Sequence, residues 1–136
     1  MASGIYDEFK EDLMDGSVNI DAAGDTLNVA LYDNVDAFTA TDTTYTTSNE
    51  LPTAGGYTTG GQVLANQLVT LAANTATFDA DDSSWAAATF TTYHCVIYDV
   101  TNTNSLMCSI DFGGAQTVTA GTFTIEWNAN GIISLT

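Results

Sequence analysis

The chain has 136 residues, of which 45% are hydrophobic, enough for a single domain (1–136) with its own core. It carries 17 acidic residues against one basic residue, Lys10, for a formal net charge of −16. Nucleic acids, anionic membranes and phosphorylated substrates all need several lysine or arginine side chains, so we expect no nucleic-acid and no membrane partner. The charge instead favours a basic or mixed protein surface. Salt adaptation is an alternative explanation, which the scarcity of glutamate, four residues, disfavours.

The start of the chain, MASGIYDEFKEDL, lacks the basic and apolar segments of a signal peptide, and no apolar run reaches transmembrane length. We therefore expect a soluble protein that is made in a cytoplasm. Cys95 and Cys108 show no CxxC spacing. In a reducing compartment we expect them to be free thiols.

The first element expected in chain order is an amphipathic helix over about residues 4–15. Ile5, Phe9 and Leu13 recur every fourth residue and would form one apolar stripe, and Gly16 would end the helix. A helix of this length is marginal alone in water, so its stripe must pack on something. Two partners are left open: the protein's own β domain and a neighbouring subunit.

The period of the pattern then changes to two, which is typical of β-strands. Leu27, Val29 and Leu31 alternate with other residues in the first predicted strand. A segment without any sustained period follows over about residues 33–60 and holds the only proline, Pro52. So long a loop is unusual in a compact domain and is often functional.

More strand-like segments follow this loop. They cover residues 62–71, 74–79, 89–99, 105–112, 117–127 and 132–136. Asn130 and Gly131 tolerate a positive φ and predict a hairpin turn between the last two segments. Short strands rich in Thr, Val, Ile, Phe and Tyr, joined by polar turns, predict an all-β fold. We expect an antiparallel β-sandwich or a small, jelly-roll-like barrel over about residues 25–136.

The segments 89–99 and 105–112 are expected to pair around the sequence TNTN, with the more apolar face of the hairpin in the core. The expected inward face holds Tyr93, Cys95, Ile97, Leu106, Cys108, Ile110 and Phe112. The expected outward face holds His94, Val96, Tyr98, Met107, Ser109 and Asp111. Both cysteines would then lie in the core, and in one register a cross-strand disulfide stays open as an alternative to free thiols.

The stretch FDADDSSW is a candidate calcium site, because Asp79, Asp81 and Asp82 offer three carboxylates within four positions. An EF-hand loop that starts at Asp79 needs glycine at its sixth position and an acid at its twelfth. Ser84 and Phe90 stand there instead. We therefore interpret the aspartates as solvent-facing residues at the end of a strand, with a looser calcium cage as the alternative.

No other pattern points to catalysis or to a cofactor. His94 is the only histidine, and neither a GxSxG nor a Cys–His signature accompanies it. The glycine-rich stretch GGYTTGG, residues 55–61, lacks the lysine of a phosphate loop and is interpreted as turns before a strand. His94, Cys95 and Cys108 are three ligands of the zinc type, where a structural site needs four. We therefore predict that the protein is not an enzyme.

Several motifs occur in an order that is similar to that of a known family. They are SGIYDEFKEDLMDG, NVALYD, GGYTTGGQVL, FDADDSSW, CVIYD, SIDFGG and FTIEWNANGIISL. As a set, and over nearly the full length, they resemble small virion proteins of tailed phages that are described as capsid decoration or cement proteins.

This resemblance implies a β-sandwich on the outer capsid surface of the virion, where it would bind the major capsid protein and bridge its subunits. It also implies a homotrimer that assembles in the host cytoplasm, and it carries over no catalytic residue. The negative charge agrees with an outer position, because packaged DNA repels an acidic protein. Contacts with the capsid or with other subunits are expected at Ile5, Phe9 and Leu13 and, on the long loop, at Phe38 and Tyr45.

Two other functions stay open. One is a structural component of the phage tail or fibre. The other is a glycan-binding surface module, in which aromatic side chains on loops would stack on sugars. The candidates for such stacking are Tyr32, Tyr45, Tyr57 and Trp85.

Overall fold

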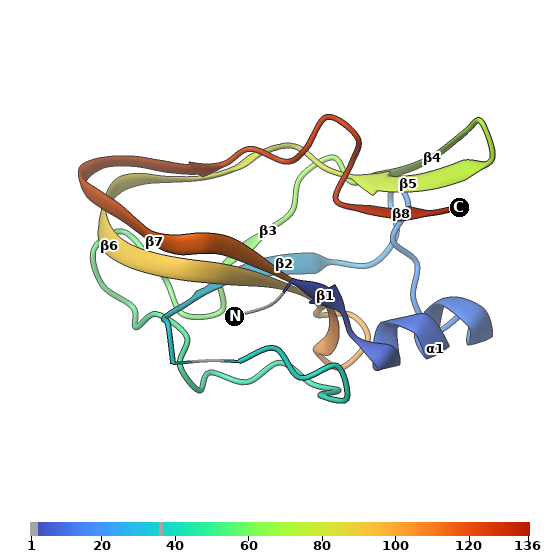
Figure 1. The fold of residues 1–136 in the computed structure, drawn as a ribbon, viewed down its shortest axis with the longest axis horizontal. Helices are drawn as coiled ribbons and strands as arrows, with labels where there is room; N and C mark the ends of the chain where they lie inside the picture. Colours follow the sequence, from blue (N-terminus) through green and yellow to red (C-terminus); the bar gives the residue numbers. More distant parts are fainter. Residues whose placement is uncertain (1–2, 36) are drawn as a thin grey trace.

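The computed structural model describes residues 3–35 and 37–136, which form an antiparallel β fold with one short helix (Figure 1). The helix within these residues is α1 (Asp7–Asp15). The strands are β1 (Gly4–Ile5), β2 (Leu27–Tyr32), β3 (Gln62–Val63), β4 (Leu68–Ala72), β5 (Thr75–Asp79), β6 (Ser83–Asp99), β7 (Ser105–Ile125) and β8 (Ile133–Leu135). The predicted all-β fold with a short N-terminal helix is therefore confirmed.

The strands form two sheets. The larger sheet has the order β1-β7-β6-β2-β3, and the smaller sheet has the order β4-β5-β8. Most of the larger sheet is the hairpin of β6 and β7, which bends back so that its two halves lie in different layers (Figure 1). The register between these strands shifts between Trp85 and Phe90 and again between Thr92 and His94. Such bulges let one strand pair take part in both layers of a sandwich.

One hydrophobic cluster lies between the layers. Leu27, Val29 and Leu31 of β2 point into it and are fully buried, as the alternation of the sequence predicts. Phe9 of α1 and Phe78 of β5 belong to the same cluster. The helix and the smaller sheet are therefore both anchored to the larger sheet through this core.

The opposite face of the larger sheet is also buried, contrary to the prediction. Val96 and Tyr98 lie there in a second cluster, together with Tyr32 of β2. The long loop covers this cluster, and the ring of Tyr45 stacks on that of Tyr98 with centroids 4.0 Å apart. The described part of the loop has no helix or regular strand, as expected. The aromatic side chains of the loop nevertheless bury this face of the sheet, which was expected to point outward.

A bulge places Leu106 and Met107 on the faces opposite to those predicted. Ile97 pairs with Cys108 while Tyr98 pairs with Leu106, so Met107 is the extra residue. Met107 therefore packs in the first cluster and Leu106 in the second. Strict alternation cannot reveal such an insertion, because it changes the face of each residue beyond it.

Both cysteines lie in the core as free thiols, as expected. Cys95 pairs with Ile110 and not with Cys108, so the register that would place the two thiols opposite each other is not adopted. Burial raises the pKa of Cys108 to about 12 and the pKa of Cys95 well above its ordinary value. Both side chains therefore stay protonated and apolar at neutral pH.

The helix begins later than predicted, because Gly4 and Ile5 form β1 beside β7. Ile5 is therefore not part of the helix stripe, and the prediction of a helix over 4–15 is wrong at its start. Gly16 ends the helix as expected, with a φ of 82° and a backbone N–H that donates to the carbonyl of Asp12. Among the described residues, no helix is long and apolar enough to cross a membrane.

The C-terminal strand pairs differently from the prediction. Gly131 adopts a φ of 93° in a turn in which its N–H donates to the carbonyl of Asn128 at 2.8 Å. This turn leads to β8, which pairs with β5 of the smaller sheet and not with β7. The predicted strand over 62–71 is likewise divided, since β3 pairs with β2 and β4 with β5. Local turn chemistry does not determine which strand becomes the partner.

Candidate functional site

The contact residues predicted from the sequence are Ile5, Phe9, Leu13, Phe38 and Tyr45. Phe38 packs on Tyr6 with ring centroids 4.9 Å apart, and Tyr45 stacks on Tyr98. Ile5 packs against the first cluster. These three side chains therefore contact the protein's own core. Phe9 belongs to the core and also lines a surface cleft, which Leu13 lines as well.

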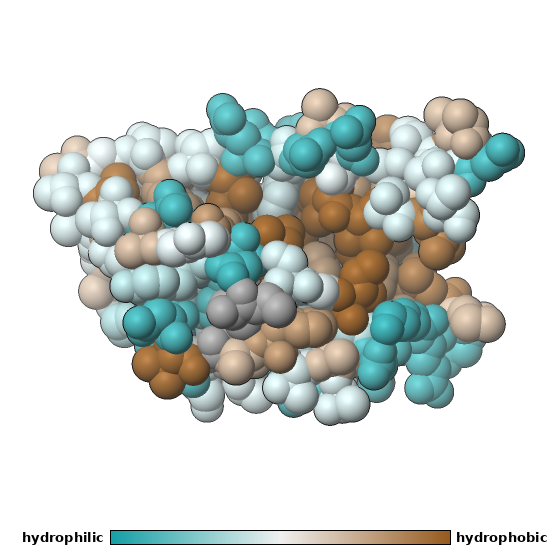
Figure 2. All heavy atoms as spheres, viewed as in Figure 1, coloured by the Kyte–Doolittle hydropathy of each residue, from teal (hydrophilic) through white to brown (hydrophobic). Residues whose placement is uncertain are grey.

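An apolar cleft of about 160 Å³ lies between α1 and the smaller sheet. Figure 2 shows it as a brown hollow next to the hydrophilic surface of the helix. Phe9 lies at its base and is 1% exposed, whereas Leu13 is 42% exposed. Ile20, from the segment after the helix, also lines it, and every lining side chain is apolar. Of the two stripe residues in the helix, Phe9 is therefore buried and Leu13 is accessible.

The register of the smaller sheet makes one wall of this cleft. The inner row across its three strands consists of Val69, Phe78 and Ile133. The outer row, two residues further along β4, consists of Leu71, Ala76 and Leu135. Phe78 is buried, but Leu71 is 77% exposed and Leu135 is 70% exposed. The apolar face of the sheet therefore extends beyond the protein's own core, as contact surfaces do.

Negative charge lies next to the cleft. The exposed carboxylate of Asp21 accepts a hydrogen bond at Oδ1 from the backbone N–H of Val69 at 3.0 Å. This bond and another from a neighbouring backbone N–H lower the pKa of Asp21, so it is charged at neutral pH. Lys10 donates to Asp7 at 2.7 Å, so the single basic side chain of the sequence is already paired on the helix.

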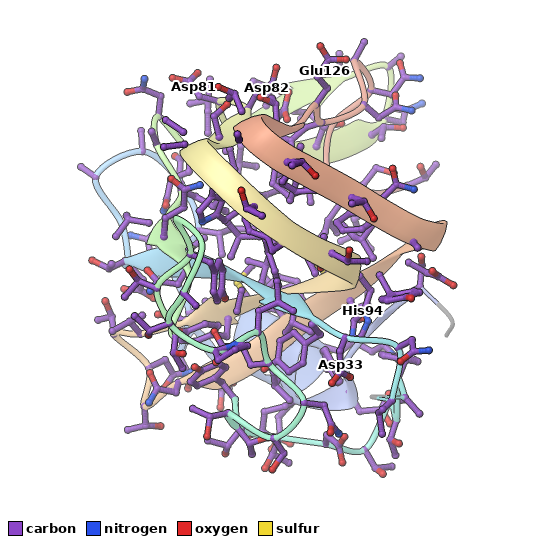
Figure 3. The ribbon with its side chains drawn as sticks, turned by 90° about the vertical axis from the view of Figure 1, so that its left-hand side faces the viewer. Asp33, Asp81, Asp82, His94 and Glu126 are labelled. Atoms are coloured by element: carbon purple, nitrogen blue, oxygen red, sulfur yellow. The ribbon has the colours of Figure 1, made fainter. Side chains whose placement is uncertain are left out.

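The three aspartates of FDADDSSW make separate contacts. Asp79 Oδ1 accepts a hydrogen bond from the following backbone N–H. Asp81 Oδ2 accepts one from Asn66 Nδ2 at 2.6 Å, and Asp82 Oδ1 accepts one from the backbone N–H of Trp127 at 2.9 Å (Figure 3). Across residues 3–35 and 37–136, no three Asp, Glu, His or Cys side chains form a group able to hold a metal ion. Asp81 and Asp82 are exposed in the connection between β5 and β6, whereas Asp79 is partly buried at the end of β5.

The aromatic side chains proposed for sugar stacking are mostly inaccessible. Tyr32, Tyr57 and Trp85 are between 2% and 6% exposed, and one face of the Tyr45 ring is covered by Tyr98. The expectation that these rings stand open on loops is therefore wrong. Stacking on a sugar needs an open ring face, and of these four rings Tyr45 is the one that is partly exposed.

A buried carboxylate organises the long loop. Glu50, which is 8% exposed, accepts hydrogen bonds from the Tyr57 hydroxyl at 2.6 Å, from the Gly60 N–H at 2.7 Å and from the Tyr45 hydroxyl. The Tyr57 hydroxyl accepts one from the Leu31 N–H at 2.9 Å, which ties the loop to β2. Burial and the nearby carboxylate raise the pKa of both tyrosines, so their hydroxyls remain donors at physiological pH.

Glu50 was missed at the level of sequence, although a signal for it exists. It is the only charged residue between Asp42 and Asp79, and it is flanked by tyrosines at short spacing. A lone acid within an uncharged segment that folds into a protein must be solvated or hydrogen-bonded, since an unpaired buried charge is costly. The sequence signal for the apolar cleft is weaker, because a sequence does not distinguish exposed leucines from buried ones.

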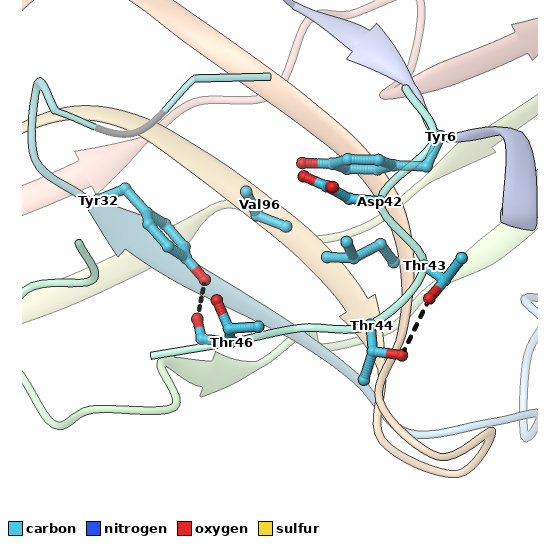
Figure 4. A pocket seen from close by; sticks show the side chains of 8 residues that line it. Tyr6, Tyr32, Asp42, Thr43, Thr44, Thr46 and Val96 are labelled. Carbon is cyan, nitrogen blue, oxygen red and sulfur yellow. Dashed lines mark hydrogen bonds between the residues drawn. The ribbon is translucent and has the colours of Figure 1, made fainter. Parts of the chain in front are cut away.

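A second cleft, of about 450 Å³, lies between the long loop and the larger sheet (Figure 4). Tyr6, Tyr32 and Val96 line it, and Asp42 is the carboxylate among the described residues of its lining. The Tyr32 hydroxyl donates to the carbonyl of Thr46 at 2.7 Å and so links sheet and loop.

Two carboxyl groups meet at the end of β6. Asp99 is fully buried, and its Oδ1 accepts a hydrogen bond from the Asn102 N–H at 3.1 Å. Within the part of the chain that the structure describes, no N–H group donates a hydrogen bond to Asp99 Oδ2. This oxygen faces the carboxyl group of Asp25. Burial, and then the neighbouring Asp25, raises the pKa of Asp99 to about 6.

We expect this pair to make the protein less stable as the pH rises from about 4 to about 6. In that range the folded protein holds a proton at Asp99 that the unfolded chain has already released, so the free energy of unfolding decreases with pH. The decrease should be on the order of 2–3 kcal/mol. Urea unfolding at pH 4.5 and at pH 7.5 measures it. Asp99→Asn should remove this part of the pH dependence, and an unchanged dependence in the variant would contradict the assignment.

Comparison of the chain with protein-family models, with curated proteins and with solved structures found no match. The family that the motifs resemble, and the function that this resemblance implies, therefore stay predictions.

Proposed function

We propose that this protein is a non-enzymatic capsid decoration protein of a tailed phage, which binds the outer surface of the head and bridges major capsid protein subunits. The observation that carries this proposal is the apolar cleft on a chain of net charge −16. The exposed Leu13 and Leu135 line the cleft, and the exposed Leu71 continues the same face of the smaller sheet. Such a charge keeps a protein soluble, and a contiguous apolar surface on it is suited to contact with another protein. The order of the sequence motifs supports a place in the virion.

A protein that bridges capsid subunits needs a rigid fold. Contacts within this chain support such rigidity. The long loop is held by Glu50 and by the stacked rings of Tyr45 and Tyr98. Reactive side chains are withdrawn from the surface, since His94 and Cys95 are fully buried and the raised pKa of Cys95 keeps it a thiol. These features favour a structural function over a catalytic one.

The homotrimer is also part of the proposal. Each copy carries a net charge of −16, so the contacts between copies must be apolar or screened by ions. The outer edge of β7 is such a surface, because no charged residue lies between Phe112 and Ile125. Over this stretch, within the part of the chain that the structure describes, β7 pairs only with β6. An unpaired strand edge without charge is suited to contact with another copy.

The copy number of this chain relative to the major capsid protein tests the proposal. In purified, intact particles we expect a ratio of one to one, or of one to a small integer, measured by quantitative mass spectrometry. Heads that lack DNA should bind the added protein, since its site lies on the outer shell. A few copies per particle would instead indicate a tail or fibre component, and absence from the particle would refute a virion function.

A further inference from the structure

We infer that the apolar cleft beside α1 receives one large aliphatic side chain of a partner protein, and that a lysine or arginine next to it in the partner pairs with Asp21. The inference rests on the proposed function, because it names the kind of capsid segment that docks there. It rests on three observations: the size of the cleft, its lining and the charge at its edge.

The size and lining of the cleft select an aliphatic side chain. A cavity of about 150 Å³ lined by aliphatic and aromatic groups accommodates a molecule as large as benzene. The cleft, at about 160 Å³, is of this size, with Phe9 and Phe78 at its base and Leu13 at its edge. A polar group that entered it would lose its water without finding a hydrogen-bond partner. A leucine or isoleucine side chain meets both requirements.

The charge at the edge selects a basic partner. Asp21 follows Ile20 in the sequence and is bonded to the backbone of Val69, and both of these neighbours line the cleft. Its Oδ1 is engaged by this bond, while the side chain as a whole stays exposed. A cation that approaches the cleft therefore meets a carboxylate that is already positioned at its edge, which favours a charge-assisted hydrogen bond.

A second copy of this chain does not meet these requirements. Its one basic side chain, Lys10, is paired with Asp7, and each copy carries a net charge of −16. Two such surfaces would bring the Asp21 carboxylates of two acidic copies toward each other, which is unfavourable. The occupant is therefore a different protein that presents an aliphatic residue between basic residues.

Three acetylated, amidated tripeptides serve as probes of the full-length protein: Lys-Leu-Lys, Lys-Ser-Lys and Glu-Leu-Glu. Titrations followed by amide chemical shifts should show Lys-Leu-Lys perturbing the residues that line the cleft. We expect Lys-Ser-Lys to bind about tenfold more weakly, because it lacks the leucine that would be buried. Glu-Leu-Glu should cause no shift at the cleft.

Matched variants test the apolar contact and the charged contact separately. Leu13→Ser and Asp21→Asn should each weaken binding of Lys-Leu-Lys about tenfold. Val35→Ser and Glu126→Gln, which change exposed residues outside the cleft, should leave it unchanged. Leu135→Ser gives an independent test of the apolar contact if Leu13→Ser fails to fold.

Three results would overturn the inference: equal binding of Lys-Leu-Lys and Lys-Ser-Lys, equal binding of Glu-Leu-Glu, and shifts that lie away from the cleft. Cleft shifts that appear with protein concentration alone would also overturn it, because they would identify a second copy as the occupant. These results are independent of the copy number in particles. If the copy number agrees with a decoration protein but the cleft binds none of the peptides, this inference is refuted and the proposed function stands.

Discussion

Replacement of Glu50 by alanine should lower the free energy of unfolding by about 3–5 kcal/mol. The substitution leaves the hydroxyls of Tyr45 and Tyr57 and the N–H of Gly60 without their acceptor. Each buried donor without a partner costs about 1–3 kcal/mol, partly offset where the opened loop admits water. The loss is large because one side chain satisfies three groups at once.

Urea unfolding followed by tryptophan fluorescence measures this effect, since the Trp85 ring lies 6.2 Å from the Tyr57 ring. Amide hydrogen exchange over residues 43–60 should also become faster, because the loop loses its central attachment. Glu50→Gln keeps the shape and one acceptor oxygen, so we expect a smaller loss of about 1–2 kcal/mol. Glu126→Ala, which changes an exposed acid, is the control and should stay within about 0.5 kcal/mol. If Glu50→Ala unfolded like this control, the carboxylate would not hold the loop.

Replacement of Phe9 by alanine should lower the free energy of unfolding by about 3–5 kcal/mol, the usual cost of removing a buried phenylalanine ring. Phe9 is 1% exposed and packs in the first core cluster. The helix that carries it has nine residues and is too short to be stable alone in water. Without this ring, α1 loses its contact with the first core cluster.

Urea unfolding and hydrogen exchange across α1 measure this second effect. The matched control is Met14→Ala in the same helix, where the side chain is 92% exposed and the change should stay within about 0.5 kcal/mol. Equal effects of the two substitutions would show that the helix does not depend on the core. The contrast with Leu13 is also informative. Leu13→Ser should leave stability nearly unchanged while it weakens docking.

Phe9 and Leu13 show why a stripe in a sequence cannot be assigned to one role. Both follow the same helical spacing, and the sequence left open whether the stripe packs on its own β domain or on another subunit. The structure places Phe9 under the smaller sheet and leaves Leu13 at the edge of the cleft. The difference arises because Phe9 packs in the core cluster that includes Phe78 of β5, whereas Leu13 lines the open cleft between the helix and the smaller sheet.

The contacts of the long loop and the length of the strands in the β6–β7 hairpin could also not be predicted from the sequence. No periodicity in residues 33–60 indicated that Tyr45 would cover Tyr98, or that Glu50 would bind two tyrosines. Two separate strands were expected over residues 105–112 and 117–127, on either side of Gly113 and Gly114. The chain continues instead as the single strand β7, with both glycines at positive φ.

Features that depend on neighbouring residues could be predicted from the sequence. These are the all-β class, the short N-terminal helix that ends at Gly16, the inward side chains of β2 and the turns of GGYTTGG. The pairing of β8 with β5, the burial of both faces of the larger sheet and the cleft beside α1 could not be predicted in this way. Period and turn chemistry act over only a few residues. Strand partners and burial depend on segments that meet only when the whole chain has folded.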